Sequence, residues 1–180
     1  MTKVRYNSSD TSKVDYVYDK LNRITSRTVT NGTSSYATQY AYVPGATAYG
    51  ENATTPLVSS ITQGEGENAM NFAYTYDSRG NITSETRNGL TTTYVYDALG
   101  QLIRVNDPHE NATWIYSYDR GGNILNKAKY AYTTADELGE DLESILYTYG
   151  DANWKDKLTA YNGVSITYDA IGNPLSDGTW

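Results

Sequence analysis

The feature that most constrains this chain is a short unit that recurs along its 180 residues. The unit has two tyrosines separated by one residue, then an aspartate, a glycine three places further on, and an apolar residue soon after. Its copies are Tyr74, Tyr76, Asp77, Gly80; Tyr94, Tyr96, Asp97, Gly100; Tyr116, Tyr118, Asp119, Gly122; Tyr16, Tyr18, Asp19, with Asn22 in place of glycine; and Ile166, Tyr168, Asp169, Gly172. Self-similarity at a short period is typical of repeat architectures.

Each part of the unit has a physical reason within a β-hairpin. Residues two apart in a strand share a face, so both tyrosines of a unit point the same way. The aspartate ends the strand, because its carboxylate can accept bonds from backbone N–H groups just ahead of it. The glycine supplies a position with positive φ, for which Asn22 is the best non-glycine substitute. One repeat is therefore predicted to be one hairpin.

The connection between successive hairpins is also predicted to be a tight turn. Asn31-Gly32, Asn88-Gly89 and Asn162-Gly163 are strong signals for two-residue hairpin turns. Residues 106–108 (Asn-Asp-Pro) indicate a looser turn.

We therefore predict an all-β fold, a single repeat array of antiparallel β-hairpins over residues 1–180 that forms a spiralling sheet. The expected units lie near residues 14–32, 38–62, 72–90, 92–108, 114–132, 145–162 and 164–180. Two insertions, 43–70 and 133–144, interrupt the array. The first is expected to be a long loop with a short strand near residues 57–62, and the second a short helix or an acidic loop.

Composition agrees with sheets and excludes several classes of function. The chain has 19 tyrosines and 3 tryptophans against a single phenylalanine, whereas disordered chains are depleted in aromatic residues. The net charge of −7 argues against a nucleic-acid partner, which needs concentrated Lys and Arg. No cysteine is present, so disulfides and thiolate metal sites are excluded. No apolar run approaches the roughly 18 residues of a membrane span.

Residues suited to catalysis or metal binding are sparse. His109 is the only histidine, and its neighbours indicate a surface turn. The aspartates recur in every unit, whereas an active site is normally singular, so we expect them to be structural and the chain not to be an enzyme. Asp151, Asn153 and Asp156, or the acidic residues of 136–143, could offer oxygen ligands, but neither segment fits the calcium-binding EF-hand pattern. We expect no metal and no cofactor.

The aromatic residues leave one alternative open. Flat aromatic faces stack on sugar rings, so exposed aromatic side chains could contact a glycan; the candidates are Trp154, Trp114 and Tyr161, with Trp180 as a further tryptophan. The competing interpretation is that these side chains form cross-strand pairs that hold the sheet together.

The recurring pattern Tyr-x-Tyr-Asp-x-x-Gly-Asn resembles the YD repeat of the RHS family. This family includes bacterial polymorphic toxins, shell subunits of insecticidal toxin complexes, wall-associated proteins of Gram-positive bacteria and animal teneurins. Residues 147–180 are particularly similar to the clostridial wall-associated type; the residues concerned are Tyr147, Tyr149, Trp154, Leu158, Tyr161, Tyr168, Asp169, Gly172 and Asn173.

The resemblance implies a strip of sheet that spirals into a hollow shell, which in toxin members encloses a C-terminal toxin or effector. This chain has no counterpart of the family's DPxGL segment, of the autoproteolysis site after it, or of an effector domain. It is therefore expected to be an internal segment of a large secreted or cell-surface bacterial protein. Its expected partners are other repeats of the parent chain and, through open sheet edges, further copies of itself.

Overall fold

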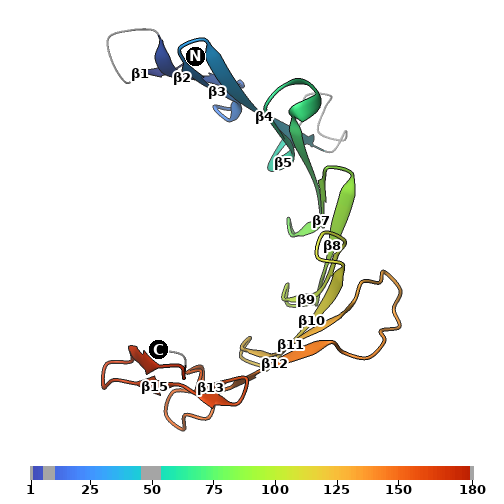
Figure 1. Cartoon of the computed structure of the whole chain (residues 1–180), viewed down its shortest axis with the longest axis vertical. Coiled ribbons are helices and arrows are strands. Elements are labelled where there is room, and N and C mark those ends of the chain that lie inside the picture. Colours follow the sequence, from blue (N-terminus) through green and yellow to red (C-terminus); the bar gives the residue numbers. More distant parts are fainter. Residues whose placement is uncertain (1, 6–10, 46–53, 179–180) are drawn as a thin grey trace. The chain divides into compact units, whose positions relative to one another are not determined.

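The computed structural model describes residues 2–5, 11–45 and 54–178, and their regular secondary structure consists almost entirely of antiparallel strands (Figure 1). The only helical element among these residues is a single 3-10 turn, η2 (Gly66–Asn68). The chain divides into two compact units, Met1–Thr91 and Thr92–Trp180. The predicted all-β array of antiparallel hairpins is confirmed.

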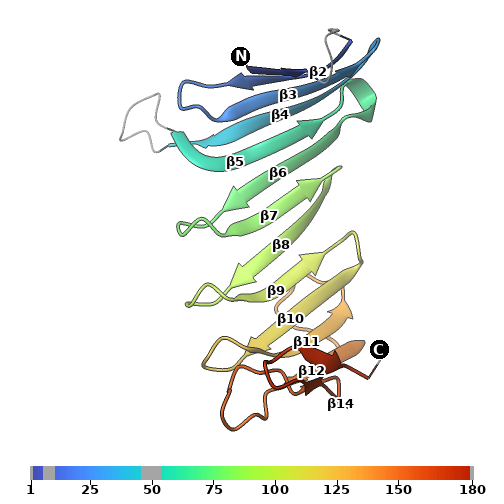
Figure 2. The ribbon, with the colours of Figure 1, turned by 90° about the vertical axis from the view of Figure 1, so that its left-hand side faces the viewer.

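In the first unit the strands follow one another in space as they do in the sequence. They are β1 (Thr2–Arg5), β2 (Ser12–Tyr18), β3 (Ile24–Asn31), β4 (Ser34–Pro44), β5 (Thr54–Gln63), β6 (Met70–Tyr76) and β7 (Ile82–Arg87). Each pairs antiparallel with the next, and Figure 2 shows β2 to β6 lying side by side.

The second unit repeats this order. Its strands are β8 (Leu90–Tyr96, which begins at the end of the first unit), β9 (Leu102–Asp107), β10 (Ala112–Tyr118), β11 (Ile124–Ala131), β12 (Glu143–Thr148), β13 (Ala160–Tyr161), β14 (Val164–Ser165), β15 (Thr167–Tyr168) and β16 (Pro174–Ser176). The last two strands form a separate two-stranded sheet.

A register shift marks the second tyrosine of each unit. Tyr76, for example, pairs with Ile82 although its neighbour Thr75 pairs with Ser84, so the return strand carries one extra residue. The same shift occurs at Tyr18, Tyr96, Tyr118 and Tyr168. One extra residue opposite a normal strand is a β-bulge, which bends the strand and leaves a backbone group out of the ladder.

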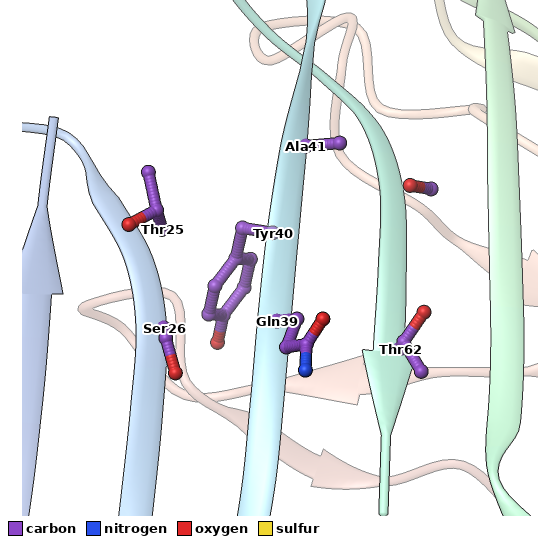
Figure 3. Close-up of a pocket in the computed structure, with 7 residues that line it drawn as sticks. Thr25, Ser26, Gln39, Tyr40, Ala41 and Thr62 are labelled. Atoms are coloured by element: carbon purple, nitrogen blue, oxygen red, sulfur yellow. The ribbon is translucent and has the colours of Figure 1, made fainter. Parts of the chain in front are cut away.

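The two faces of each sheet differ in chemistry. The tyrosines of a unit share one face, which we call the tyrosine face, and the residue between them lies on the other. On that opposite face Thr75 is hydrogen-bonded to Thr83 (2.8 Å) and to Ser84 (2.6 Å). Small polar side chains of this kind line up across neighbouring strands there, as Figure 3 shows for Ser26, Gln39 and Thr62.

Little of the described chain is buried. The hydrophobic side chains that are buried in it are small, namely Val14, Ala37, Ala112 and Ala128. A single layer of sheet has no second layer to enclose a core. Hydrogen bonds within and between the hairpins must therefore supply much of what an ordinary core would supply.

Both insertions differ from expectation in part. In the first, β4 continues to Pro44 and β5 runs from Thr54 to Gln63, so the strand is longer than the short one predicted near residues 57–62, because β5 pairs with β4 on one side and β6 on the other. Residues 46–53 lie outside the described residues. In the second insertion residues 132–142 form a loop without a helix, and β12 already begins at Glu143.

The Asn31-Gly32 turn is displaced by one residue from its expected place. Asn31 belongs to β3 and pairs with Ser34, so Gly32 and Thr33 are the turn residues. At the other two sites asparagine and glycine both have positive φ, as the sequence predicted; these are Asn88 (50°) with Gly89 (83°) and Asn162 (47°) with Gly163 (80°).

Candidate functional site

The aspartate of each unit organises the turn that joins its two strands, which we call the Asp turn. At Asp77 the carboxylate Oδ1 accepts hydrogen bonds from the N–H groups of Arg79 and Asn81, both at 2.9 Å. Oδ2 accepts a third bond from the Asn81 side chain, also at 2.9 Å. The N–H of Gly80 donates to the Asp77 carbonyl at 3.1 Å, and Gly80 has a φ of 87°.

The same arrangement recurs at the other units. Asp119 and Asp169 accept the same three bonds, from Gly121 and Asn123 and from Ile171 and Asn173. Asp97 accepts the two backbone bonds, from Leu99 and Gln101, both at 2.8 Å. The predicted positive φ is confirmed at each turn glycine, for example 83° at Gly100.

The turn at Asp19 keeps this geometry with different residues. Asn22 has a φ of 59° at the position of the glycine, as predicted. Arg23 takes the place of the asparagine, and its guanidinium donates to Asp19 Oδ2 through Nε at 2.7 Å. The same guanidinium lies over the ring of Tyr42, 3.9 Å from its centroid, and bonds to Thr54 Oγ1 and to the carbonyl of Thr55. Arg23 therefore ties its turn to the next hairpin.

These donors stabilise the ionised aspartates. The side-chain bond from Asn81 is the largest effect on Asp77 and lowers its pKa; partial burial, the next largest, raises it, but the backbone bonds from Asn81 and Arg79 add to the first effect and the pKa is lowered. At Asp19 partial burial is the largest single effect and raises the pKa, but the combined bonds from Arg23 and Leu21 outweigh it and the pKa is lowered. The side-chain bonds from asparagine are likewise the largest cause of the lowered pKa of Asp119 and of Asp169.

The hydroxyl of the second tyrosine of a unit links its hairpin to the backbone of an upstream segment. The Tyr118 hydroxyl donates to the backbone carbonyl of Leu102 at 2.7 Å, and Leu102 opens the return strand of the preceding unit. Further bonds of this kind run from Tyr42 to Ile24 (2.8 Å), from Tyr76 to Val58 (2.7 Å) and from Tyr168 to Leu158 (2.7 Å). We call these bonds tyrosine ties. Burial raises the pKa of Tyr76 and Tyr118, so their hydroxyls remain protonated donors well above neutral pH.

The sequence pattern placed both tyrosines of a unit on one face but did not identify the partners of their hydroxyl groups. The signal that could have found them is the ratio of 19 tyrosines to one phenylalanine. Packing alone would accept either ring, so a near-exclusive use of tyrosine indicates that the hydroxyl has a specific partner.

Candidates for catalysis and metal binding do not assemble into a site in the described part of the chain. His109 is exposed, and its backbone N–H donates to Asp107 Oδ1 at 2.8 Å. Asp151 accepts bonds from the N–H groups of Asn153 and Trp154 and from Lys157 Nζ. Asp156 Oδ1 accepts from the Asn123 side chain at 3.0 Å. These carboxylates therefore hold a loop, and no group of three or more His, Asp or Glu residues there is arranged to hold a metal ion.

Two of the three predicted glycan contacts are open to solvent. Trp154 is 54% exposed, and its ring lies against Gly172, where an added Cβ would come within 3.2 Å of Cζ3. Tyr161 is 41% exposed. Among the described residues no ring contact joins the predicted three to one another, and Trp180 lies outside those residues.

Trp114 is the covered member of the three. Lys127 Nζ lies 4.0 Å and Lys129 Nζ 5.2 Å from its ring centroid, and the indole N–H donates to Glu110 at 3.0 Å. The ring face over which these ammonium groups lie is not available for a sugar.

An open hollow of about 280 Å³ lies in the first unit between β3, β4 and β5 (Figure 3). It is lined by Thr25, Ser26, Gln39, Tyr40, Ala41, Ser60 and Thr62. No carboxylate, ammonium or imidazole lines it, so it lacks a group for acid–base chemistry at neutral pH. Among the described residues no helix is long and apolar enough to cross a membrane.

Comparison with known proteins places this geometry among RHS repeats. An RHS repeat model matches residues 76–109 and 96–135. The tRNA3(Ser)-specific nuclease WapA of Bacillus spizizenii is 30% identical over 124 residues, which make up 63% of this chain but 5% of that protein.

Solved structures show the same fold. The crystal structures of TcdB2-TccC3 without its hypervariable C-terminal region and of TcdB2-TccC3-Cdc42 each match with a TM-score of 0.51 and 15% identity, over 91% of this chain and 11% of theirs. The chain thus spans a small part of each protein that it matches.

Proposed function

Because the chain belongs to the RHS/YD-repeat family, we propose that it is a non-enzymatic wall segment of a large secreted or cell-surface bacterial protein. The observation that carries this proposal is that the Asp turn recurs from unit to unit and the tyrosine tie recurs with it. An active site would occur once, whereas these contacts recur in several hairpins of the array.

The contacts suit a thin wall. A single sheet layer buries few apolar side chains, so its hairpins need directional bonds to keep their spacing. The Asp turn fixes the end of each hairpin, and the tyrosine tie fixes one hairpin to an upstream segment. Together they give a sheet that can be extended without a second layer.

The parent protein is proposed to form a hollow shell around a C-terminal toxin or effector. The fold shared with TcdB2-TccC3 supports a shell-type sheet, and the similarity to a protein named as a nuclease supports a toxin context. In this proposal the segment contributes wall, and any catalytic activity belongs to a region outside it.

Limited proteolysis of the full-length protein that carries this segment tests the proposal. We expect its C-terminal region to resist protease and to become cleavable when Tyr118→Phe and Asp119→Ala are combined. The matched variant Tyr116→Phe, which removes a hydroxyl from the same strand, should leave the protection intact. If protease cleaved the C-terminal region of the unmodified protein as fast as that of the double variant, enclosure would be contradicted. Catalytic turnover by the segment alone would contradict the non-enzymatic role.

A carbohydrate-binding or adhesion role is the second candidate, and the exposure of Trp154 favours it. The ring is 54% exposed, while bonds from Asn153 and Trp154 N–H to Asp151 fix the backbone beneath it. A fixed, exposed indole is suited to stacking on a sugar ring.

A glycan panel tests this candidate. Saturable binding to one sugar class that is lost in Trp154→Ala and retained in Trp114→Ala would establish the site. Absence of binding across the panel, or equal loss in both variants, would remove it.

A further inference from the structure

Two tyrosine rings lie in edge-to-face contact between β12 and β13. Tyr147 and Tyr161 are directly paired in the register, and their ring centroids lie 5.3 Å apart at an interplanar angle of 79°. Tyr161 is 41% exposed, while Tyr147 is half-buried. Tyr16 and Tyr18, the other close tyrosine pair among the described residues, lie within one strand with ring centroids 6.4 Å apart.

The pair sits in the most sparsely paired part of the sheet. β13 and β14 have two residues each, and β13 pairs with β12 at two positions. The N–H of Thr159 donates to the Thr148 carbonyl and that of Asn162 to the Leu146 carbonyl, both at 2.7 Å. A covalent bond here would therefore add proportionally more restraint than one between the longer strands.

We propose that Tyr147 and Tyr161 are the site of an oxidative dityrosine cross-link, formed with hydrogen peroxide as oxidant and a haem peroxidase as catalyst. This inference is independent of the wall-segment proposal. Each phenol loses one electron and one proton and becomes a phenoxyl radical with spin density on Cε. The two radicals join in a Cε–Cε bond, and the ring hydrogens on these carbons move to the oxygens, which restores both phenols. One peroxide takes up the two electrons and two protons and yields two waters.

The geometry favours this pair over other tyrosines. Residues directly opposite in an antiparallel pair have Cβ atoms roughly 5 Å apart, so both rings stay within reach of each other as they turn. An edge-to-face pair needs only rotation about its side-chain bonds to bring the two Cε atoms together. The exposure of Tyr161 lets an electron carrier reach it, whereas the tied tyrosines have their hydroxyls bonded to backbone carbonyls.

Cross-linking would close the segment between the two strands. Residues 148–160 would then lie in a covalent loop that contains Trp154 and Asp156. Because such a bond restricts the unfolded chain more than the folded one, the end of the second unit should melt at a higher temperature after oxidation.

Oxidation of the purified chain with peroxidase and dilute peroxide tests the assignment. We expect blue dityrosine fluorescence on a monomeric chain, and a cross-linked peptide pair, lighter by two hydrogens, that maps to Tyr147 and Tyr161. The fluorescence should fall to background in Tyr161→Phe and in Tyr147→Phe, and persist in Tyr18→Phe. The variants are expected to fold because phenylalanine preserves the ring, and circular dichroism checks that they do.

Three results would overturn the proposal. These are cross-links that map to other tyrosines, fluorescence that persists in Tyr161→Phe, and cross-links found only between two chains as a dimer on a denaturing gel.

Discussion

The Asp turns at Asp19 and Asp119, which lie in the first and second compact units, have the same hydrogen bonds but different residues. In both, the aspartate accepts two backbone bonds and one side-chain bond. The turn at Asp119 uses Gly122 and Asn123, whereas that at Asp19 uses Asn22 and Arg23. The difference shows that the turn needs positive φ at one position, which either glycine or asparagine can supply, and that the next position accepts different side-chain donors.

Asn123 and Arg23 also differ in the further contacts that they make. Asn123 bonds its own aspartate and reaches Asp156 at 3.0 Å. Arg23 spans further, because its guanidinium also covers Tyr42 and bonds to the chain at Thr54 and Thr55. The longer side chain thus joins a turn contact and a contact between hairpins in one residue.

The largest expected effect comes from breaking what both turns share, the positive φ. Gly100→Val should lower the free energy of unfolding by about 2 kcal/mol, because a β-branched residue is strained at the φ of 83° found there. Gly100→Asn should cost clearly less, since Asn22 occupies the same position at 59°. Urea unfolding followed by circular dichroism gives both values.

Ala98→Val is the control for size and branching in the same turn. Its position does not have positive φ, so a change within about 0.5 kcal/mol is expected. Equal losses in Gly100→Val and Ala98→Val would contradict the assignment of the turn.

Removal of the side-chain donor should lower the free energy of unfolding by different amounts at the two turns. Arg23→Ala should cost about 1.5 kcal/mol, since it removes a charge-assisted bond, a cation–π contact and the bonds to the next hairpin. Asn123→Ala should cost about 0.5 kcal/mol, since it removes two bonds at a solvent-exposed turn. Thermal melts of the two variants provide the measurement, and a larger loss for Asn123→Ala would refute the wider role of Arg23.

The tyrosine tie should be separable from tyrosine packing. Tyr118→Phe should lower the free energy of unfolding by about 1 kcal/mol, because the Leu102 carbonyl loses its donor while the ring remains. Tyr116→Phe changes the preceding tyrosine of the same strand and should have little effect. Urea denaturation gives the free energy of unfolding of both variants. If both values equalled that of the unmodified chain, the tie would make no contribution to stability.

The smallest expected effect is on acid titration. The bonds at Asp119 lower its pKa, so the associated stability is present above the usual aspartate pKa near 4 and is lost as the pH falls through the lower folded value. Asn123→Ala removes the largest cause and should raise the titration midpoint of the Asp119 carboxyl carbon in NMR. Asp77 in the same variant should titrate unchanged, and a midpoint that stays in place at Asp119 would exclude the asparagine bond as the cause.

Much of the fold could be predicted from the sequence because its signals are local. The pattern of one unit, for example Tyr74, Tyr76, Asp77 and Gly80, depends only on contacts within one hairpin. Positive φ at Asn22 follows from the chemistry of asparagine. Contacts between hairpins were not predictable in the same way. The partner of the Tyr118 hydroxyl lies 16 residues away, and that of the Arg23 guanidinium at Thr55 lies 32 residues away. Such contacts depend on which strands become neighbours.

The candidate site was predictable in kind more than in detail. Trp114 and Trp154 look alike in sequence, yet two lysines of β11 cover the first while a turn glycine supports the second. The displaced turn at Gly32 arises because Asn31 is held in β3 by its pairing with Ser12 of β2 as well as with Ser34. In both cases contacts with residues distant in the sequence contributed to the outcome.

The tyrosine ties also determine how an array of this kind can change length during evolution. The ties span 18, 18, 16 and 10 residues, so each depends on a nearby upstream segment and on nothing more distant. Gene duplication or deletion of a whole hairpin would leave every remaining hydroxyl beside a carbonyl. Gain or loss of one residue within a strand would move the tyrosine to the other face. Inheritance of repeats as intact hairpins is therefore favoured, and arrays of very different length can arise from one ancestral unit.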